Sequence, residues 1–237
     1  MLYNFFDKNI YISYLARIVM VSVKEKDFVQ IIYTGKIKGS GKVFDTTEES
    51  VAKKEGLLSN DSHHHFGPMV VAVGSHQLVE GLEKQIIGKE VGKEFTVDIR
   101  PREAFGERNS EVVKVIPVAN LTKEKIHPFP GLQLDFGGKM GTVKTVSGGR
   151  VTIDFNHPLA GKEISYTATV LKIVEGVEEK VGALLFSMLH THKDDYELKV
   201  EDKNVSIKLN NPIPDQLKPL IKQQMETLLS GVTVSFN

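Results

Sequence analysis

The stretch Phe66–Ile87, FGPMVVAVGSHQLVEGLEKQII, decides the fold because its hydrophobic period changes halfway along. Its first half contains the β-rich run Met69–Val73, which predicts a short strand. In its second half the apolar residues Leu78, Leu82 and Ile86 recur every four positions, which predicts a helix with one face on a core. We therefore expect a strand that leads directly into a short helix.

The junction between these two elements is a candidate binding site. The first N–H groups of a helix have no partner inside it, and Gln77 and Val79 lie at this point. No glycine-rich phosphate loop and no lysine follows Gly74 directly. An apolar ligand that carries a carbonyl group therefore suits the junction better than a phosphate does.

The composition excludes several classes of protein. The 237 residues are 41% hydrophobic, as in ordinary globular proteins, and 30 basic residues balance 30 acidic ones. With no net charge there is no electrostatic footprint for nucleic acid or an anionic membrane, so we expect neither partner. The absence of cysteine excludes disulfides, thiolate catalysis and cysteine-ligated zinc, and it fits a cytoplasmic protein. Nothing marks a cofactor site.

Residues 1–20 are interpreted as an N-terminal extension. The charges Asp7, Lys8 and Arg17 interrupt its apolar residues well short of the ~20 that a membrane-spanning helix needs. They also lie mid-segment, unlike those of a signal peptide. We favour a loose extension or a start assigned too far upstream, with Met20 as the actual start, and an amphipathic surface anchor is the alternative.

Alternating apolar residues predict further strands on both sides of the opening stretch. Phe28–Lys38 and Val43–Thr46 precede it, and Phe95–Ile99 follows it. The segment Glu48–Glu55 is predicted to be a helix that Gly56 ends.

The sequence pattern changes over residues 107–155, where short predicted strands are separated by glycine-rich hairpin turns. This predicts a small β-rich domain. The long alternating run Lys162–Val174 is best suited to pair with the strands before this domain. The β-rich domain is therefore interpreted as an insertion into a domain made of residues 21–106 and 156–174.

Residues 175–237 form a third segment of mixed α+β type, with two helices around a hairpin and a last strand. About 60 residues make a marginal core, so the segment is expected to dock either on another copy or on the rest of the chain. We predict a homodimer through this segment. The helix residues expected in its interface are Leu184, Leu185, Leu220 and Ile221.

Several short motifs follow one another in the order and spacing of a known family. They are Tyr33-Thr34-Gly35, Val43-Phe44-Asp45-Thr46, Val73-Gly74 with Leu78-Val79-Glu80-Gly81-Leu82, Ala104-Phe105-Gly106 and Tyr166. Together they resemble the FKBP-type peptidyl-prolyl cis-trans isomerases. The segment Asn156–Gly161, after the inserted domain, resembles the SlyD subfamily, whose flap carries an insert-in-flap chaperone domain. Residues 175–237 resemble the C-terminal dimerisation domain of the long archaeal type.

The resemblance implies an α+β fold, in which an antiparallel sheet wraps on a short helix, with an inserted small β-rich domain and a C-terminal α+β domain. It also implies the site. The catalytic residues would be Tyr33, Asp45, Phe105 and Tyr166, and the substrate-binding residues would be Phe44, Met69, Val71, Gln77, Leu78, Val79 and Leu82. Asp45 would either accept a hydrogen bond from Tyr33 or face the twisted amide.

Three departures from the family pattern limit what is carried over. Phe105 stands where the family usually has a tyrosine that donates a hydrogen bond to the substrate, so this donor is missing and a lower rate or weaker proline binding is expected. Leu82 stands where many relatives have a tryptophan. The metal-binding tail of the SlyD subfamily is absent, so nickel delivery is not expected. In the run His63–His65, only His63 and His65 would share one face of an extended loop, and no third ligand is evident. A solvated loop is therefore favoured over a metal site.

The function implied is isomerisation of X–Pro bonds in unfolded or partly folded polypeptides. An apolar pocket that removes water from the amide favours the twisted, less polar state, and no acid, base or nucleophile is needed. The alternative is a holdase chaperone with a vestigial pocket, because the inserted domain has more apolar residues than it can easily bury. The residues expected on its chaperone surface are Val113, Val115, Ile116, Leu121, Phe129, Leu132 and Phe136.

Overall fold

The structure is a computed structural model that describes residues 21–58 and 66–237. Two expectations lie outside these residues. They are the N-terminal extension over residues 1–20 and the possible metal ligands His63–His65.

An antiparallel sheet forms the first unit of the molecule. Its strands run in the order β2-β1-β9-β4, and β3 pairs with the same edge of β1 as β2 does. The predicted pairing of the long strand near residues 162–174 is confirmed, because β9 pairs with both β1 and β4. The bounds are β1 (Phe28–Ile37), β2 (Val43–Thr46), β3 (Met69–Ala72), β4 (Glu94–Ile99) and β9 (Ile164–Val174).

The helix predicted after β3 packs on this sheet. It is α3 (Glu80–Ile86), which buries Leu82 and Ile86 in the core of the unit. Gly81 allows the close approach, since a Cβ at this position would collide with Ile99 on β4. With α2 (Glu49–Glu55) and the short 3₁₀ helix η1 (Pro101–Glu103), these elements confirm the predicted α+β class.

The insertion has a sheet and a core of its own. The strands run in the order β5-β8-β7-β6, and the helix α4 (Val118–Lys123), which we had not predicted, places Leu121 in that core beside Val143, Val151 and Ile153. The bounds are η2 (Ser110–Val112), β5 (Val113–Pro117), β6 (Gln133–Asp135), β7 (Met140–Ser147) and β8 (Arg150–Asp154).

Two chain segments that lead into and out of the insertion are tied together by polar side chains. Asn156 donates to the Asn109 carbonyl at 2.8 Å and to Asp154 at 2.7 Å, and Arg108 donates to Asp154 at 2.8 Å. Burial opposes ionisation of Asp154, but the hydrogen bonds from Asn156 and Arg108 outweigh it and lower the pKa of Asp154. These contacts fix the neck through which the insertion leaves the main sheet.

The C-terminal segment packs two helices and a three-stranded sheet around a second core. The sheet runs in the order β10-β11-β12, with β11 and β12 parallel. The bounds are α5 (Val177–Leu189), η3 (Lys193–Asp195), β10 (Tyr196–Glu201), β11 (Asn204–Leu209), α6 (Lys218–Leu228) and β12 (Thr233–Phe236).

This second core also includes residues of the main sheet. Phe28, Ala72 and Val174 are buried in it together with Leu184 and Leu185 of α5. Of the two docking partners considered for the C-terminal segment, the rest of the chain is therefore the one that the structure shows. Leu184 and Leu185 were wrong as interface residues, because both are fully buried within one chain and offer nothing to a second copy.

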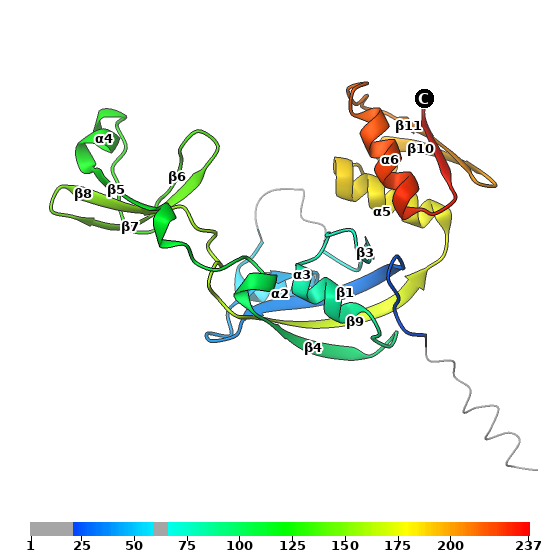
Figure 1. Ribbon diagram of the computed structural model, residues 1–237, viewed down its shortest axis with the longest axis horizontal. Coiled ribbons are helices and arrows are strands. Elements are labelled where there is room, and N and C mark those ends of the chain that lie inside the picture. Colours follow the sequence, from blue (N-terminus) through cyan, green and yellow to red (C-terminus); the bar gives the residue numbers. More distant parts are fainter. Residues whose placement is uncertain (1–20, 59–65) are drawn as a thin grey trace, which may run out of the picture.

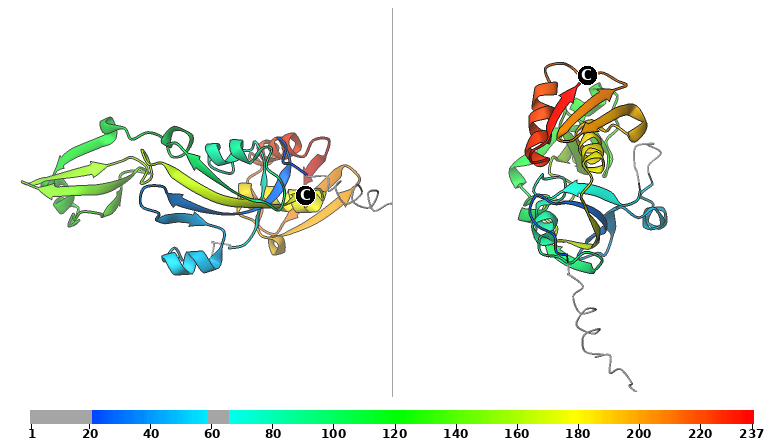
Figure 2. Two further views of the ribbon diagram at one scale, coloured as in Figure 1. Left: turned by 90° about the horizontal axis from the view of Figure 1, so that it is seen from below. Right: turned by 90° about the vertical axis from the view of Figure 1, so that its right-hand side faces the viewer.

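The insertion and the C-terminal unit lie at opposite ends of the main sheet, and in Figure 1 both rise above it. Figure 1 shows the insertion, in green, at one end and the C-terminal unit, in yellow to red, at the other, with the main sheet between them. The view from below in Figure 2 shows the same order. In the described part of the chain, no helix is long and apolar enough to cross a membrane.

Candidate active site

Four aromatic rings from separate segments meet on the main sheet. Tyr33 comes from β1, Phe44 from β2, Tyr166 from β9, and Phe105 from the loop after η1. Tyr33 and Tyr166 meet edge to face with centroids 5.5 Å apart, and Phe44 meets both Phe105 and Tyr166 edge to face at 5.7 Å. We call these four residues the aromatic cluster. It brings together the residues that the motifs predicted from distant parts of the sequence.

Gly35 allows the aromatic cluster to close. A Cβ at this position on β1 would lie 2.7 Å from Cε1 of Tyr166 and 2.9 Å from Cζ of Phe44, closer than side chains pack. The two rings thus rest directly on the backbone of β1. Gly35 was part of the Tyr33-Thr34-Gly35 motif, but its role under the rings could not be read from the sequence.

Asp45 is held by the two tyrosines. Both phenols form side-chain hydrogen bonds with its carboxylate, in which each hydroxyl donates. Burial, followed by the negative charge of Asp45, raises the pKa of Tyr33 and of Tyr166 well above the ordinary value for tyrosine. Of the two roles left open for Asp45, the structure contains the hydrogen bond from Tyr33.

The other predicted pocket residues differ in how deeply they are buried. Met69, Leu78 and Val79 are half-buried and pack against the same core as the aromatic cluster, so they can border a substrate. Val71 and Leu82 are each 1% exposed. Their predicted contact with substrate is therefore corrected to support from beneath, because neither offers an exposed surface.

Tyr166 and Gln77 also differ from the expectation of direct substrate contact. Tyr166 is only 2% exposed, so it has almost no surface to offer a substrate, and its hydroxyl is bonded to Asp45 instead. Gln77 accepts a hydrogen bond from the Ala72 N–H at 2.8 Å and lines a groove toward α5. Its side-chain oxygen is therefore used to hold the end of β3.

The loop before α3 is fixed by a carboxylate that sequence reasoning missed. Glu83 is buried, and its carboxylate accepts hydrogen bonds from the N–H groups of Gly74 and His76, each at 3.1 Å. This holds the turn that leads to Val79 at the start of the helix. The available signal was a glutamate next to Leu82 on the buried side of the predicted helix.

His157 is a second residue that the sequence analysis missed. Its ring stacks on Phe105 with the centroids 4.5 Å apart and the planes 3° from parallel. Its Nδ1 also accepts a hydrogen bond from the Leu159 N–H at 3.2 Å. The segment Asn156–Gly161 had been singled out for its resemblance only, and the contact with Phe105 depends on the tertiary fold.

The predicted chaperone surface of the insertion is partly correct in its placement. Val115 and Phe129 are both 58% exposed, and Phe136 is also exposed, while Val113, Ile116 and Leu132 are half-buried. Leu121 was wrong as a surface residue, because it is buried in the core of the insertion. The structure adds Met140 and Val146 as exposed apolar residues.

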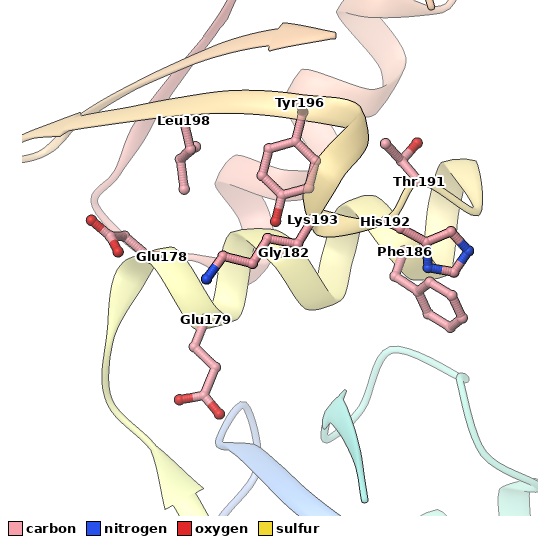
Figure 3. A pocket seen from close by; sticks show the side chains of 9 residues that line it. All are labelled: Glu178, Glu179, Gly182, Phe186, Thr191, His192, Lys193, Tyr196 and Leu198. Atoms are coloured by element: carbon pink, nitrogen blue, oxygen red, sulfur yellow. The ribbon is translucent and has the colours of Figure 1, made fainter. Parts of the chain in front are cut away.

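Two cavities lie away from the aromatic cluster, on α5. One of about 580 Å³ lies between α5 and β10, where the Tyr196 hydroxyl points at Gly182 (Figure 3). The other, of about 370 Å³, lies between α5 and β3. Among the described residues, no group of three histidine, aspartate or glutamate side chains is placed to hold a metal ion.

Comparison with known proteins identifies both the main unit and the insertion. Residues 20–122 match the model of the family FKBP-type peptidyl-prolyl cis-trans isomerase, and residues 114–159 match that of FKBP26, IF domain.

Individual relatives agree. The chain is 34% identical over 148 residues to a short-type peptidyl-prolyl cis-trans isomerase of Methanocaldococcus jannaschii, a match that covers 62% of this chain and 92% of that protein. It is 30% identical over 119 residues to the FKBP-type peptidyl-prolyl cis-trans isomerase SlyD of Vibrio cholerae, covering 48% of this chain and 59% of that protein. With an FKBP-type 16 kDa isomerase of Escherichia coli the identity is 28% over 129 residues, covering 52% and 86%.

The family match over residues 20–122 includes the strands that carry Tyr33, Phe44 and Asp45, and the SlyD resemblance expected from the motifs is confirmed. The chain therefore belongs to the FKBP-type peptidyl-prolyl cis-trans isomerases, is SlyD-like, and is an enzyme that interconverts cis and trans X–Pro bonds.

Proposed function

We propose that the aromatic cluster, with Met69, Leu78 and Val79 at its border, is the surface on which the X–Pro bond is twisted. Rotation about this bond must overcome a barrier of about 18–20 kcal/mol because the amide has partial double-bond character. The twisted amide has lost this conjugation and is less polar, so a water-free apolar surface favours it over the planar ground state. A thousandfold acceleration needs about 4 kcal/mol.

The hydrogen bonds of Asp45 are the observation that carries this assignment. A carboxylate that accepts from both Tyr33 and Tyr166 is not a free acid or base. Its oxygens are satisfied by the two phenol hydrogen bonds, so it needs no proton from the substrate, which suits a reaction that moves no proton. The N–H of Val79, at the start of α3, is assigned to the substrate carbonyl.

The substitution Phe105→Tyr tests where the proline binds. It restores the hydroxyl usual in the family on a half-exposed ring that packs on Phe44. We expect kcat/KM for a chromogenic prolyl tetrapeptide to be preserved or raised. A loss of about tenfold or more, on the scale of 1.4 kcal/mol per decade, would place Phe105 outside the site.

We further propose that the insertion retains unfolded polypeptides beside this site. Its exposed apolar residues include Val115, Phe129, Phe136, Met140 and Val146, more than a small folded domain needs to leave on its surface. Tethering a client at the insertion raises the concentration of its prolines near the site to roughly millimolar levels. The alternative, a holdase with a vestigial isomerase site, is supported by the same exposed residues.

Replacement of residues 109–154 by a short loop separates these alternatives. We expect turnover of a tetrapeptide to survive, because the aromatic cluster lies outside the insertion, while catalysis of proline-limited protein refolding falls by at least about tenfold. Substitution of Phe129 and Val115 by serine is the milder variant and should move the refolding assay in the same direction. An equal loss in both assays would contradict retention, and a wild-type chain inactive on the tetrapeptide would favour the holdase.

A homodimer through residues 175–237 remains our proposal for the assembly, with a revised surface. On and beside α6, Leu217 is 44% exposed and Leu220 is 62% exposed, so they are available to a second copy. Light scattering of the Leu220→Glu variant should then show a monomer at concentrations where the unchanged chain and the control Leu171→Glu are dimeric. A monomeric unchanged chain would remove the proposal.

A further inference from the structure

Strand β3, which carries Met69 of the site, has an open edge. One edge pairs with β1, and no strand among the described residues pairs with the other. The N–H of Val73 points toward the β1 side, where it donates to the Asp27 carbonyl at 2.9 Å. The N–H of Ala72 points the opposite way, where it donates to the Gln77 side chain at 2.8 Å. Because backbone groups alternate along a strand, the N–H and C=O of Val70 face the open edge as those of Ala72 do.

These two groups of Val70 have no hydrogen-bond partner within residues 21–58 and 66–237. A free donor and a free acceptor on one residue of an edge strand form a template for another extended chain. An extended polypeptide backbone offers the matching acceptor and donor at the same spacing.

The cavity of about 370 Å³ lies directly at this edge. Met69 and Val70 point to opposite faces of β3, yet both line the cavity, so it opens at the edge of the strand. Ala183, Phe186 and Ser187 of α5 form the opposite wall. In Figure 1, β3 lies below α5.

A second cavity borders this one. The cavity of about 580 Å³ shares the lining residues Glu179, Phe186 and His192 with it. Figure 3 shows Phe186 and His192 side by side at this boundary, with their centroids 5.3 Å apart. At about 3.3 Å per residue, two neighbouring cavities along α5 offer room for several residues of an extended chain.

Met69 connects the groove to the proposed site of isomerisation. It lines the groove and also packs against the core that carries Tyr33, Phe44 and Phe105. We propose that a segment of the polypeptide substrate beside the isomerised proline pairs with the open edge of β3 at Val70 and lies between β3 and α5. This inference rests on the proposed prolyl site and adds a substrate subsite to it. The C-terminal unit thereby supplies one wall of the enzyme's substrate channel.

Peptides of different length test this subsite on the full chain. A prolyl tetrapeptide is compared with peptides that carry about six further apolar residues on its amino or its carboxyl side. Two backbone hydrogen bonds and apolar burial should raise kcat/KM by about tenfold for one of the two extensions. Ala183→Trp fills the groove and should abolish this gain while tetrapeptide turnover is unchanged. The matched control Ala119→Trp, at an exposed position of α4, should keep the gain.

Single N-methylation along the favoured extension distinguishes strand pairing from apolar contact alone. Pairing with Val70 predicts a loss of the gain at one position, the amide whose N–H donates to the Val70 carbonyl. Equal kcat/KM for all peptides, an Ala183→Trp effect on the tetrapeptide as large as on the extended peptide, or an equal loss at every methylated position would overturn the subsite. A dimer that Ala183→Trp dissociates would assign the groove to a second copy and would also overturn it. A tetrapeptide that is not turned over would overturn the prolyl site itself, so the two failures are distinguishable.

Discussion

At the scale of single residues, His157 packs directly on the ring of Phe105. The His157 ring stacks on Phe105 with the centroids 4.5 Å apart, and the Phe44 ring meets Phe105 edge to face. Phe105 is therefore held by two neighbouring rings. Aromatic pairs contribute about 0.5–1.5 kcal/mol beyond burial, so His157→Ala should lower kcat/KM for a tetrapeptide by about threefold to tenfold. His157→Phe keeps a ring in place and should retain most of the activity. If both variants had the same kcat/KM as the unchanged chain, the stack would not order Phe105.

The two buried phenols make a prediction at alkaline pH. Burial and Asp45 raise the pKa of Tyr166 in the folded chain, whereas in the unfolded chain the phenol ionises near its ordinary value of about 10. The stability that this shift contributes is fully present below about pH 10 and is lost as the pH rises above it, by about 1.4 kcal/mol per pH unit for each such group. Urea unfolding between about pH 8 and 11 should therefore show a smaller loss for Tyr166→Phe than for the unchanged chain. Equal slopes would contradict the buried Tyr166–Asp45 contact.

The sequence predicted the identity of the site residues better than their depth. Four of these residues stand in short motifs whose order and spacing resemble those of the family, and this made them predictable: Tyr33, Phe44, Asp45 and Phe105. Whether Val71 or Met69 contacts a substrate depends on which layers cover them, and that is a property of the assembled fold. The stack of His157 on Phe105 likewise joins residues far apart in sequence, so no local pattern could have indicated it.

At the scale of elements, Gly35 tests the close packing of β1 under the aromatic cluster. A methyl group there would press on Tyr166 and Phe44 at 2.7 and 2.9 Å, and overpacking of this kind costs about 1–3 kcal/mol. Gly35→Ala should therefore lower both the free energy of unfolding and kcat/KM. Gly39→Ala is the matched control, because a Cβ there has nothing within 4 Å and should change both little. Equal effects of the two substitutions would mean that the rings do not rest on β1.

The apolar run of β3 predicts a strand but does not indicate which part of the molecule packs on each of its faces. Every residue from Met69 to Val73 is apolar apart from backbone groups, and the run predicted a strand. Its two faces serve two cores, since Val71 belongs to the main core and Ala72 to the core shared with the C-terminal unit. A strand covered on both faces has no polar side to reveal which partner covers which face. The same ambiguity led to the assignment of Leu184 and Leu185 to a dimer interface.

At the scale of the whole molecule, the main sheet is the base on which both other units stand. The insertion is joined by a polar neck at Asp154 and Asn156, whereas the C-terminal unit shares a continuous apolar core with β1, β3 and β9. The two attachments differ in the interactions that hold them, which are polar contacts at the insertion and apolar burial at the C-terminal unit. A polar neck can loosen at small cost, but a shared core couples the stability of the two units.

Phe28 reports on this shared core. It is 2% exposed on β1, packs in the core of the C-terminal unit, and lies with its ring centroid 5.4 Å from the Lys180 ammonium on α5. Phe28→Ala should lower the free energy of unfolding by about 3–5 kcal/mol, whereas the partly exposed Leu171→Ala on β9 should cost much less.

The dependence on protein concentration decides what this loss means. Because the docking is within one chain, the loss caused by Phe28→Ala should be the same in dilute and concentrated samples. If residues 175–237 contributed to stability only by joining two copies, the unfolding midpoint would rise with concentration and the variant would reduce that rise. Urea unfolding at two concentrations about a hundredfold apart separates the two cases. A loss that appears only at high concentration would contradict docking within the chain, and with it the wall that α5 offers to the groove beside β3.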